Sequence, residues 1–402
     1  MRIRVSSRNN AVYPADVPRY VRLLKGFLGH QALANSQRRL DDELSHHGLC
    51  YRHLAMERRP WLFAVREYDA ATLGGLRTLR QYPIDFQLLA GDGLLLSSLH
   101  GLMSPAVRAK YARDLLLDTH LDYMHELRTA WQYYLRGFHL IWPEPGQIRG
   151  PEFRVSGGGQ DFDVECRHFG TDFSQVAKSP AVTSLCDVVY EVLAAQNRWG
   201  EVNLEIRDGY VFDSSQVKGW RRTLREAIEA GTADFELGPT VGVRWQIQPS
   251  PSPELTAKDV AALRRGTEPG QFTCVCTKQR NGSGVEAVAM RCSTPRRTGF
   301  DLRDHLYSTL KAKVKLQLGS DRAGVLVVKF SGISDRTVFE ESEGMRSVLG
   351  RLFQQPQLST VIFRCADVIE SSDHLTVSSG PAVVYHNPHA SYPAVQQFRH
   401  LS

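Results

Sequence analysis

One short segment carries the residue types and spacing of a hydrolytic metal site. Residues 151–155 and 161–168 are predicted to form the strands of a β-hairpin, because the intervening Ser-Gly-Gly-Gly-Gln suits a tight turn. Side chains alternate between the faces of a strand, so the second strand should place Phe162, Val164 and Cys166 on one face, and Asp163, Glu165 and Arg167 on the other. Glu152 enters the first strand. Carboxylates gathered in this way can bind a hard divalent cation, which makes water nucleophilic enough to hydrolyse a phosphodiester.

The residues alone leave a second interpretation open. Glu152, Glu165 and Arg167 also fit a solvent-exposed hairpin face with a cross-strand ion pair worth at most about 1 kcal/mol. Asp163 is more typical of a solvated position than of a metal ligand. The three consecutive glycines are interpreted as a turn and not as a phosphate-binding loop, because no GK[ST] sequence and no helix start follow them.

The segment before the hairpin contains a further carboxylate, Glu126, on a predicted helix. Residues 112–137 have the spacing of one long helix, and a short buried strand is predicted at 138–142. The predicted apolar stripe of the helix consists of Leu117, Leu121, Met124, Trp131 and Leu135. Glu126 lies across the helix from this stripe, so it is a surface residue unless the sheet packs on its side. Tyr123, Ala130 and Tyr134 are apolar enough to allow that packing.

The rest of the chain predicts a mixed α/β architecture, because predicted strands alternate with predicted helices. In the last hundred residues the pattern is a helix at 302–318, a strand at 324–330, a helix at 338–353 and a strand at 360–364. We expect four parts along the chain. They are a mainly helical N-terminal region (1–110), the first part of a core (111–200), an α+β, β-rich insertion or small second domain (201–298), and the second part of the core (299–402).

Composition and charge bound the class of protein. Hydrophobic residues make up 42% of the 402 residues and charged residues 23%, which excludes a disordered chain. The net charge of +6 is compatible with a phosphate-bearing partner. No apolar signal core or membrane-length apolar run is present, so we expect no membrane association and a cytoplasmic location. The seven cysteines lack zinc-ribbon spacing and are expected to be reduced, mostly buried thiols.

The hairpin motif resembles the signature of the PD-(D/E)XK nuclease superfamily, whose members share a restriction-endonuclease-like fold. Pro151–Glu152 stands where that family has Pro-Asp, and Glu165–Cys166–Arg167 stands where it has Asp or Glu, any residue, then Lys. The run 163–167 looks like the Val-Glu-Cys-Lys strand of some members, and Tyr385–His386–Asn387–Pro388 looks like their closing segment. The resemblance covers about 112–195 and 300–390.

The resemblance implies a fold, a cofactor and a partner. The fold is a restriction-endonuclease-like core, with a mixed central sheet flanked by helices. The cofactor is Mg²⁺ or Mn²⁺, and the partner is nucleic acid, DNA rather than RNA. The implied metal ligands are Glu126, Glu152, Glu165 and the main-chain carbonyl of Cys166. A protein partner is also compatible with it, and the oligomeric state has no signature in the sequence.

Arg167 departs from the family pattern, in which lysine holds this position. Its guanidinium can stabilise a phosphate but cannot accept a proton. A cation from another element could replace the lysine, and Lys178, on the next predicted helix, is the nearest candidate. Lys311, Lys313 and Lys315 form a basic run on the helix at 302–318 that could contact a nucleic-acid backbone, although a solvated helix face also fits them.

Two functions are therefore expected, one of which is not an enzyme. The leading hypothesis is a metal-dependent nuclease in which Glu126, Glu152 and Glu165 hold the metal and Arg167 stabilises the transition state. The alternative is the same fold without catalysis, acting as a protein- or nucleic-acid-interaction module, and Arg167 is its main support. An α/β protein unrelated to nucleases is a third interpretation.

Overall fold

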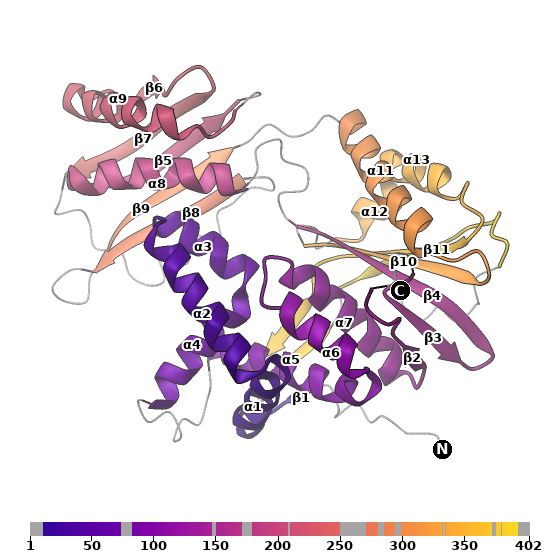
Figure 1. Ribbon diagram of the computed structural model, residues 1–402. Coiled ribbons are helices and arrows are strands. Elements are labelled where there is room, and N and C mark those ends of the chain that lie inside the picture. Colours follow the sequence, from indigo (N-terminus) through magenta and orange to yellow (C-terminus); the bar gives the residue numbers. More distant parts are fainter. Residues whose placement is uncertain are drawn as a thin grey trace. The chain divides into compact units, whose positions relative to one another are not determined.

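The chain folds into two compact units of mixed α/β structure, shown by a computed structural model (Figure 1). The first unit comprises residues 1–38, 58–170 and 299–402, and the second comprises 39–57 and 171–298. The structure describes residues 11–73, 83–146, 150–170, 179–207, 210–249, 271–279, 285–293, 299–371 except 332 and 334, 375–378 and 380–392. The mixed α/β class predicted from the sequence is confirmed.

A six-stranded mixed sheet forms the centre of the first unit. Its strand order is β14 (Ala382–His386), β11 (Leu358–Arg364), β10 (Ala323–Phe330), β4 (Gln160–Phe169), β3 (Phe153–Gly157) and β2 (His139–Ile141). Strands β4, β10 and β11 are parallel to one another, and the outer pairs are antiparallel. Every residue of β10 and β11 is buried, as expected of parallel strands that are covered on both faces.

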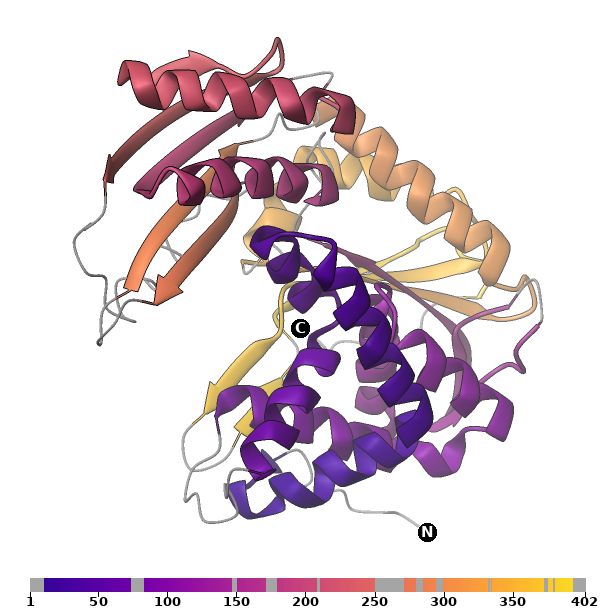
Figure 2. The ribbon, with the colours of Figure 1, turned by 60° about the vertical axis from the view of Figure 1, so that its left-hand side comes forward.

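Helices cover both faces of this sheet. Helix α7 (His120–Leu135) packs on one face, where the Tyr133 and Phe162 rings are 5.6 Å apart, whereas α11 (Gly299–Gln317) and α13 (Glu343–Leu352) lie on the other (Figures 1 and 2). Helix α12 (Thr337–Glu341) precedes α13. Leu306, Leu310 and Val314 are buried on α11 at four-residue steps, which fixes the face that α11 turns to the sheet.

Helices also dominate the N-terminal part of the first unit. They are α1 (Val17–Leu28), α4 (Pro60–Leu73), α5 (Ile84–Leu99) and α6 (Pro105–Asp114), with short 3-10 turns at Pro14–Asp16 and His100–Leu102. Helix α1 packs closely on α5, where a Cβ atom at Gly93 would lie 2.2 Å from the Tyr20 carbonyl oxygen. A small antiparallel sheet has the order β1 (Ala11–Val12), β13 (Leu375–Ser378), β12 (Val368–Ser371).

The predicted single helix at 112–137 is wrong. The chain leaves α6 at Asp114 and starts α7 at His120, and the turn between them is closed by hydrogen bonds from the Leu117 amide and the Thr119 hydroxyl to the Asp114 carbonyl. The predicted apolar stripe is consequently wrong at Leu117 and Leu121, which are exposed. Its members Met124 and Trp131 are buried.

A five-stranded sheet forms the centre of the second unit. The strand order is β6 (Asp234–Glu236), β7 (Val241–Pro249), β5 (Arg198–Ile206), β9 (Val285–Ser293) and β8 (Gln271–Gln279). Helices α8 (Ser179–Ala195) and α9 (Val217–Ala230) lie together on one face of the sheet (Figure 2), and a 3-10 turn at Ser214–Gln216 precedes α9. The core includes Trp199, Trp220 and Trp245.

A buried carboxylate joins the 39–57 segment to the rest of the second unit. Helix α2 (His30–Ser45) leads into this segment, and α3 (Leu49–Arg58) follows. Asp187 of α8 accepts hydrogen bonds from the amides of Cys50 (2.7 Å) and Tyr51 (3.3 Å), so it caps the first turn of α3. A Cβ atom at Gly48 would lie 2.3 Å from this carboxylate, so the close approach requires glycine.

Buried thiols reinforce the same core. Cys50 and Cys276 have sulfur atoms 3.5 Å apart, and those of Cys186 and Cys292 are 3.2 Å apart. The six cysteines whose side chains the structure describes are all buried thiols outside any disulfide. None of the helices in the described ranges combines the length and the apolar character that crossing a bilayer requires.

Candidate active site

The predicted hairpin exists and brings Glu152 beside Glu165. Gly158 and Gly159 have φ angles of +63° and +79°, which suits a two-residue turn and favours glycine at both positions. Phe153 of β3 pairs with Val164 of β4, and the Glu152 amide donates a 3.1 Å hydrogen bond to the Val164 carbonyl. The next positions along the two chains are therefore neighbours across the hairpin.

Strand β4 continues beyond its pairing with β3. Residues 165–169 pair with β10 on one side, while the register with β3 ends at Val164. Carbonyls two residues apart on a strand point the same way, so the Cys166 carbonyl points to the side on which Val164 meets β3. The Cys166 carbonyl oxygen, on the edge of β4 beyond Glu152, is therefore next to the carboxylates of Glu152 and Glu165.

Lys313 lies between these two carboxylates. Its Nζ atom is 2.8 Å from Oε1 of Glu165 and 3.4 Å from Oε1 of Glu152. Glu165 is fully buried, and its Oε2 atom accepts no hydrogen bond from the groups that the structure describes. Lys313 reaches this position from α11, where it is three residues after buried Leu310 and next to buried Val314.

A third carboxylate approaches the cluster from the other face of the sheet. Glu126 of α7 is buried and accepts a 3.0 Å hydrogen bond from the hydroxyl of Tyr111 on α6. The Nζ atom of Lys110 lies 5.6 Å from the centre of the Tyr111 ring and 5.4 Å from that of Tyr123. The surface position that the sequence left open for Glu126 is therefore wrong, and Ala130 on the same side of the helix is also fully buried.

Burial and mutual repulsion shift the pKa values of these acids upwards. Burial, reinforced by the negative charge of Glu152, raises the pKa of Glu165 to about 8, against the opposing effect of Lys313. Burial and Glu152 also raise the pKa of Glu126 well above its usual value, although Lys110 opposes this. Partial burial would lower the pKa of Lys313, but Glu165 and Glu152 raise it above its usual value. Lys313 is therefore charged at neutral pH, and it faces Glu165, whose pKa lies above neutrality.

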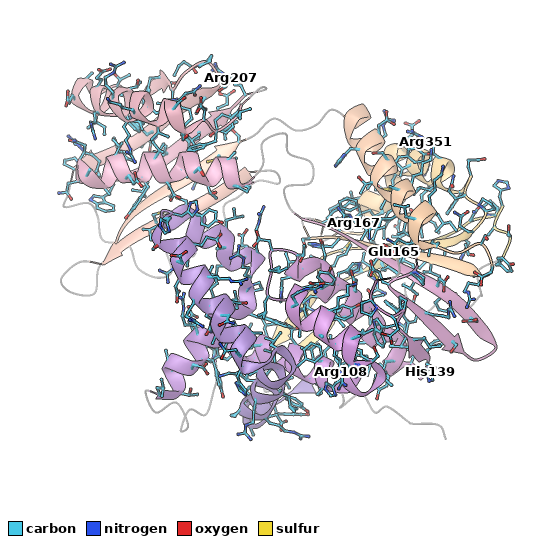
Figure 3. All side chains as sticks on the ribbon, viewed as in Figure 1. Arg108, His139, Glu165, Arg167, Arg207 and Arg351 are labelled. Carbon is cyan, nitrogen blue, oxygen red and sulfur yellow. The ribbon has the colours of Figure 1, made fainter. Side chains whose placement is uncertain are left out.

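The structure does not bring Arg167 into this cluster. Arg167 follows Glu165 by two residues on β4 (Figure 3), and its guanidinium carbon lies 5.5 Å from the centre of the Phe169 ring. In the described part of the chain it makes no ion pair with Glu152 or Glu165, whereas Lys313 pairs with both. Among the described residues, the cation that pairs with Glu152 and Glu165 is Lys313 of α11, and not the residue of β4 at the lysine position of the motif.

The other site residues predicted from the sequence do not gather at this cluster in the described part of the chain. The basic run divides, because Lys311 packs over the Tyr307 ring at 5.2 Å and Lys315 is exposed, while Lys313 points to the carboxylates. Lys178 lies outside the residues that the structure describes. Asp163 is buried away from Lys313 and pairs with Arg154 at 3.2 Å and Arg322 at 3.8 Å.

Sequence reasoning missed two parts of the site. Lys313 was expected only as a backbone contact, yet a signal was present, because it falls three residues after Leu310 and seven after Leu306, on the apolar face of its helix. Tyr111 was not singled out. It lies four residues after Val107, and both are buried, but nothing in the sequence connects it to Glu126.

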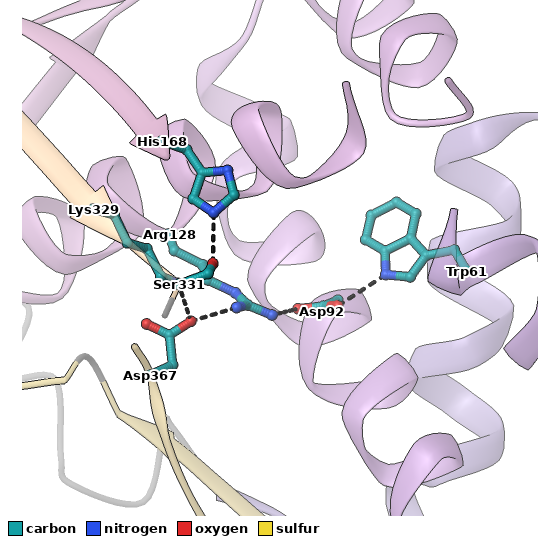
Figure 4. A network of polar contacts seen from close by, with 7 residues as sticks. All are labelled: Trp61, Asp92, Arg128, His168, Lys329, Ser331 and Asp367. Carbon is teal, nitrogen blue, oxygen red and sulfur yellow. Dashed lines mark hydrogen bonds and ion pairs between the residues drawn. The ribbon is translucent and has the colours of Figure 1, made fainter. Parts of the chain in front are cut away.

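A second polar cluster lies on the α7 face of the sheet (Figure 4). Arg128 of α7 donates to Asp367 at 2.6 Å and to Asp92 of α5 at 2.9 Å. Lys329 of β10 donates to the same Asp367 oxygen at 2.6 Å, and the Trp61 indole donates to Asp92 at 2.8 Å. These contacts neutralise each charge within the cluster, so it is a structural network rather than a site.

The carboxylate cluster fits a hard divalent cation with few protein ligands. Across the described residues, no three His, Cys, Asp or Glu side chains are arranged as a ready-made metal site. Mg²⁺ commonly needs only one or two carboxylates together with water and substrate oxygens. Glu152, Glu165 with its unused buried Oε2, and the Cys166 carbonyl provide such a donor set.

Comparison with known proteins adds no further constraint. No protein-family model matches the chain, and no curated protein matches it in sequence.

Proposed function

We propose that the first unit is a metal-dependent nuclease that hydrolyses phosphodiester bonds of DNA, on a restriction-endonuclease-like core. The observation that carries this proposal is the convergence of Glu152, Glu165 and Lys313, from a hairpin and from a helix more than 140 residues later in the chain. The mixed sheet, with helices on both faces and with β4 of the hairpin beside β10 at its centre, supports the core assignment. The resemblance of the hairpin sequence to the PD-(D/E)XK signature supports the choice of reaction.

The residues have distinct roles in this proposal. Glu152, Glu165 and the Cys166 carbonyl would hold Mg²⁺ or Mn²⁺, with Glu126 adding negative charge from α7. The bound cation would supply an acidic water and offset charge on the phosphate oxygens. Lys313 keeps a positive charge at the carboxylate pair, where its ammonium can donate to a phosphate oxygen or orient the attacking water.

The presence of Lys313 in the cluster weakens the main argument for a non-catalytic interaction module, which is the loss of the motif lysine at Arg167. The departure from the family pattern at Arg167 leaves β4 without a lysine, but the cluster contains one from α11. A lysine delivered by another element can supply the same ammonium, because the chemistry needs the charge at the carboxylates and not a particular position in the chain.

A plasmid-cleavage assay with Mg²⁺ and with Mn²⁺ tests this function. We expect wild-type cleavage to fall by about 100-fold or more in Glu165→Ala and in Lys313→Met, because each removes a group that acts on the reacting phosphate. Lys218→Met is the matched control: it removes the same charge from an exposed position on α9 of the second unit, and should cleave within about threefold of wild type.

Two outcomes would contradict the proposal. Wild-type protein that cleaves neither DNA nor RNA with either metal, but binds nucleic acid, would support the non-catalytic interaction module. Cleavage that survives in both Glu165→Ala and Lys313→Met would place the activity elsewhere in the chain.

A further inference from the structure

Arg167 of β4 has no acidic partner in the described part of the chain, whereas several nearby arginines do. Its Nε atom is buried, and neither a hydrogen bond to that atom nor an ion pair to its guanidinium is found in the described part of the chain. By contrast, Arg154 on β3 pairs with Asp163 at 3.2 Å, and Arg322 before β10 pairs with Asp161 at 3.1 Å. Arg128, on the other face, holds two carboxylates.

The packing around Arg167 holds the guanidinium in place without neutralising it. The side chain is half-buried, and its guanidinium carbon lies 5.5 Å from the centre of the Phe169 ring on the same face of β4. Placing a charge in partly dehydrated surroundings costs free energy unless a counter-charge is supplied. Because the Arg167 guanidinium is held in place without a counter-ion among the described residues, it indicates an anionic ligand.

The position of Arg167 indicates which anion that is. Arg167 and Glu165 are two residues apart and point to the same face, which places them about 6–7 Å apart along the strand. This length is comparable with one nucleotide step of an extended phosphodiester backbone. A phosphate at the Glu152–Glu165–Lys313 cluster would therefore have its neighbour in the same strand within reach of Arg167.

We propose that Arg167 binds the phosphate next to the scissile one, so that the substrate is a polynucleotide strand and not an isolated phosphodiester. The proposal rests on the proposed nuclease function and assigns a different role to each cation. Lys313 acts at the scissile phosphate, and Arg167 holds the adjacent one with a guanidinium whose paired N–H groups match phosphate oxygens.

Kinetics with two substrates test this role. We compare Arg167→Gln with wild type on a DNA oligonucleotide and on bis(p-nitrophenyl) phosphate, which has a single phosphodiester and no neighbour. We expect Arg167→Gln to raise KM for the oligonucleotide by about tenfold to a hundredfold and to change kcat/KM for the small ester by less than about twofold. Arg167→Lys should recover part of the loss, because it restores the charge without the paired donors.

Binding without cleavage gives an independent measurement. Fluorescence anisotropy of a labelled oligonucleotide, with Ca²⁺ in place of Mg²⁺, should show weaker binding by Arg167→Gln and a salt dependence reduced by about one phosphate contact. Arg207→Gln is the matched control, since it removes the same charge from an exposed guanidinium that is already paired with Glu236 at 2.6 Å. It should bind as wild type does.

The possible outcomes separate the two proposals. Wild-type binding and KM in Arg167→Gln would overturn the role of Arg167, as would an equal loss on both substrates, which indicates a structural role. If wild-type protein cleaves neither substrate, the nuclease proposal fails, and the anisotropy salt slope still decides whether Arg167 contacts a phosphate.

Discussion

The ammonium of Lys313 is what allows two carboxylates to lie side by side in a buried position. Without a cation, the repulsion between Glu152 and Glu165 and the cost of burying them would act together. Even with Lys313 present, Glu165 has a pKa raised to about 8. The surroundings thus disfavour the ionised form of Glu165, and a bound divalent cation would favour it.

The first prediction concerns the pH dependence of stability in the metal-free protein. An unfolded glutamate loses its proton near pH 4.5, whereas folded Glu165 does so near 8, so between these values the folded state binds more protons. The free energy of unfolding should therefore fall as the pH rises from about 4.5 to 8. Urea unfolding in EDTA at several pH values measures this.

Glu165→Gln provides the comparison for that experiment. Glutamine imitates the protonated acid at every pH, so the difference in unfolding free energy between variant and wild type should grow in favour of the variant as the pH rises through this window. Parallel pH profiles for the two proteins would show that Glu165 titrates normally.

The sequence was informative about residues whose partners are local. Alternation along 161–168 placed Glu165 and Cys166 on opposite faces, and the structure has them so, with Glu165 towards α11 and the Cys166 side towards α7. The pairing of Glu165 with Lys313 depends on how a helix after residue 299 packs on the sheet. No local pattern reports that contact, and for this reason Lys178 looked nearer than Lys313 did.

At the scale of elements, the polar network of Figure 4 fastens α7 to its surroundings. Asp367, after β11, binds Arg128 of α7 and Lys329 of β10, and Arg128 in turn binds Asp92 of α5. Since α7 also carries Glu126, this network fixes the helix that brings the third carboxylate to the site.

The second prediction is that Asp367→Ala destabilises the first unit by about 2–4 kcal/mol. The substitution leaves the partly buried charges of Arg128 and Lys329 without this carboxylate, which costs far more than the loss of a surface pair. Glu340→Ala is the control. It breaks an exposed i,i+4 pair with Arg336 and should cost less than about 1 kcal/mol in chemical denaturation. Equal effects of the two substitutions would show that the network contributes no more than a surface contact.

Element boundaries were less predictable than element types. The helix predicted at 338–353 is divided into α12 and α13, and Ser342 caps α13 by accepting a 3.3 Å hydrogen bond from the Met345 amide. The break between α6 and α7 falls in a Leu-Leu-Leu run that favours helix by itself. Burial of Leu115 and Leu116 with exposure of Leu117 shows that tertiary packing overrides this preference.

At the scale of the whole molecule, the second unit is formed by two separate segments of the chain. Residues 39–57 belong to it although residues before and after them belong to the first unit. No pattern in the sequence indicates this, because the contact between Asp187 and the start of α3 joins segments 137 residues apart. The predicted β-rich insertion began at 201, whereas the second unit includes residues from 171, with α8 and the start of β5.

The third prediction tests that connection. Asp187→Ala removes the carboxylate that accepts from the Cys50 and Tyr51 amides, which should weaken the start of α3 by about 1–2 kcal/mol. Hydrogen exchange should become about tenfold faster in the α3 amides and remain unchanged in β10 of the first unit. Asp213→Ala removes a comparable but exposed cap, on Ser215, and should leave α3 unaffected. Unchanged exchange in Asp187→Ala would show that other contacts hold α3.

The chain order of the candidate site has a consequence for protein synthesis. Glu126, Glu152 and Glu165 are translated before residues 171–298 of the second unit, and Lys313 with β10 after them. A ribosome that has completed the three acids must add nearly 150 further residues before the lysine exists and the neighbour of β4 can pair. Nascent chains that end between Glu165 and Lys313 therefore contain the acids but not the cation, and an activity that needs both would appear only after α11 and β10 have been synthesised.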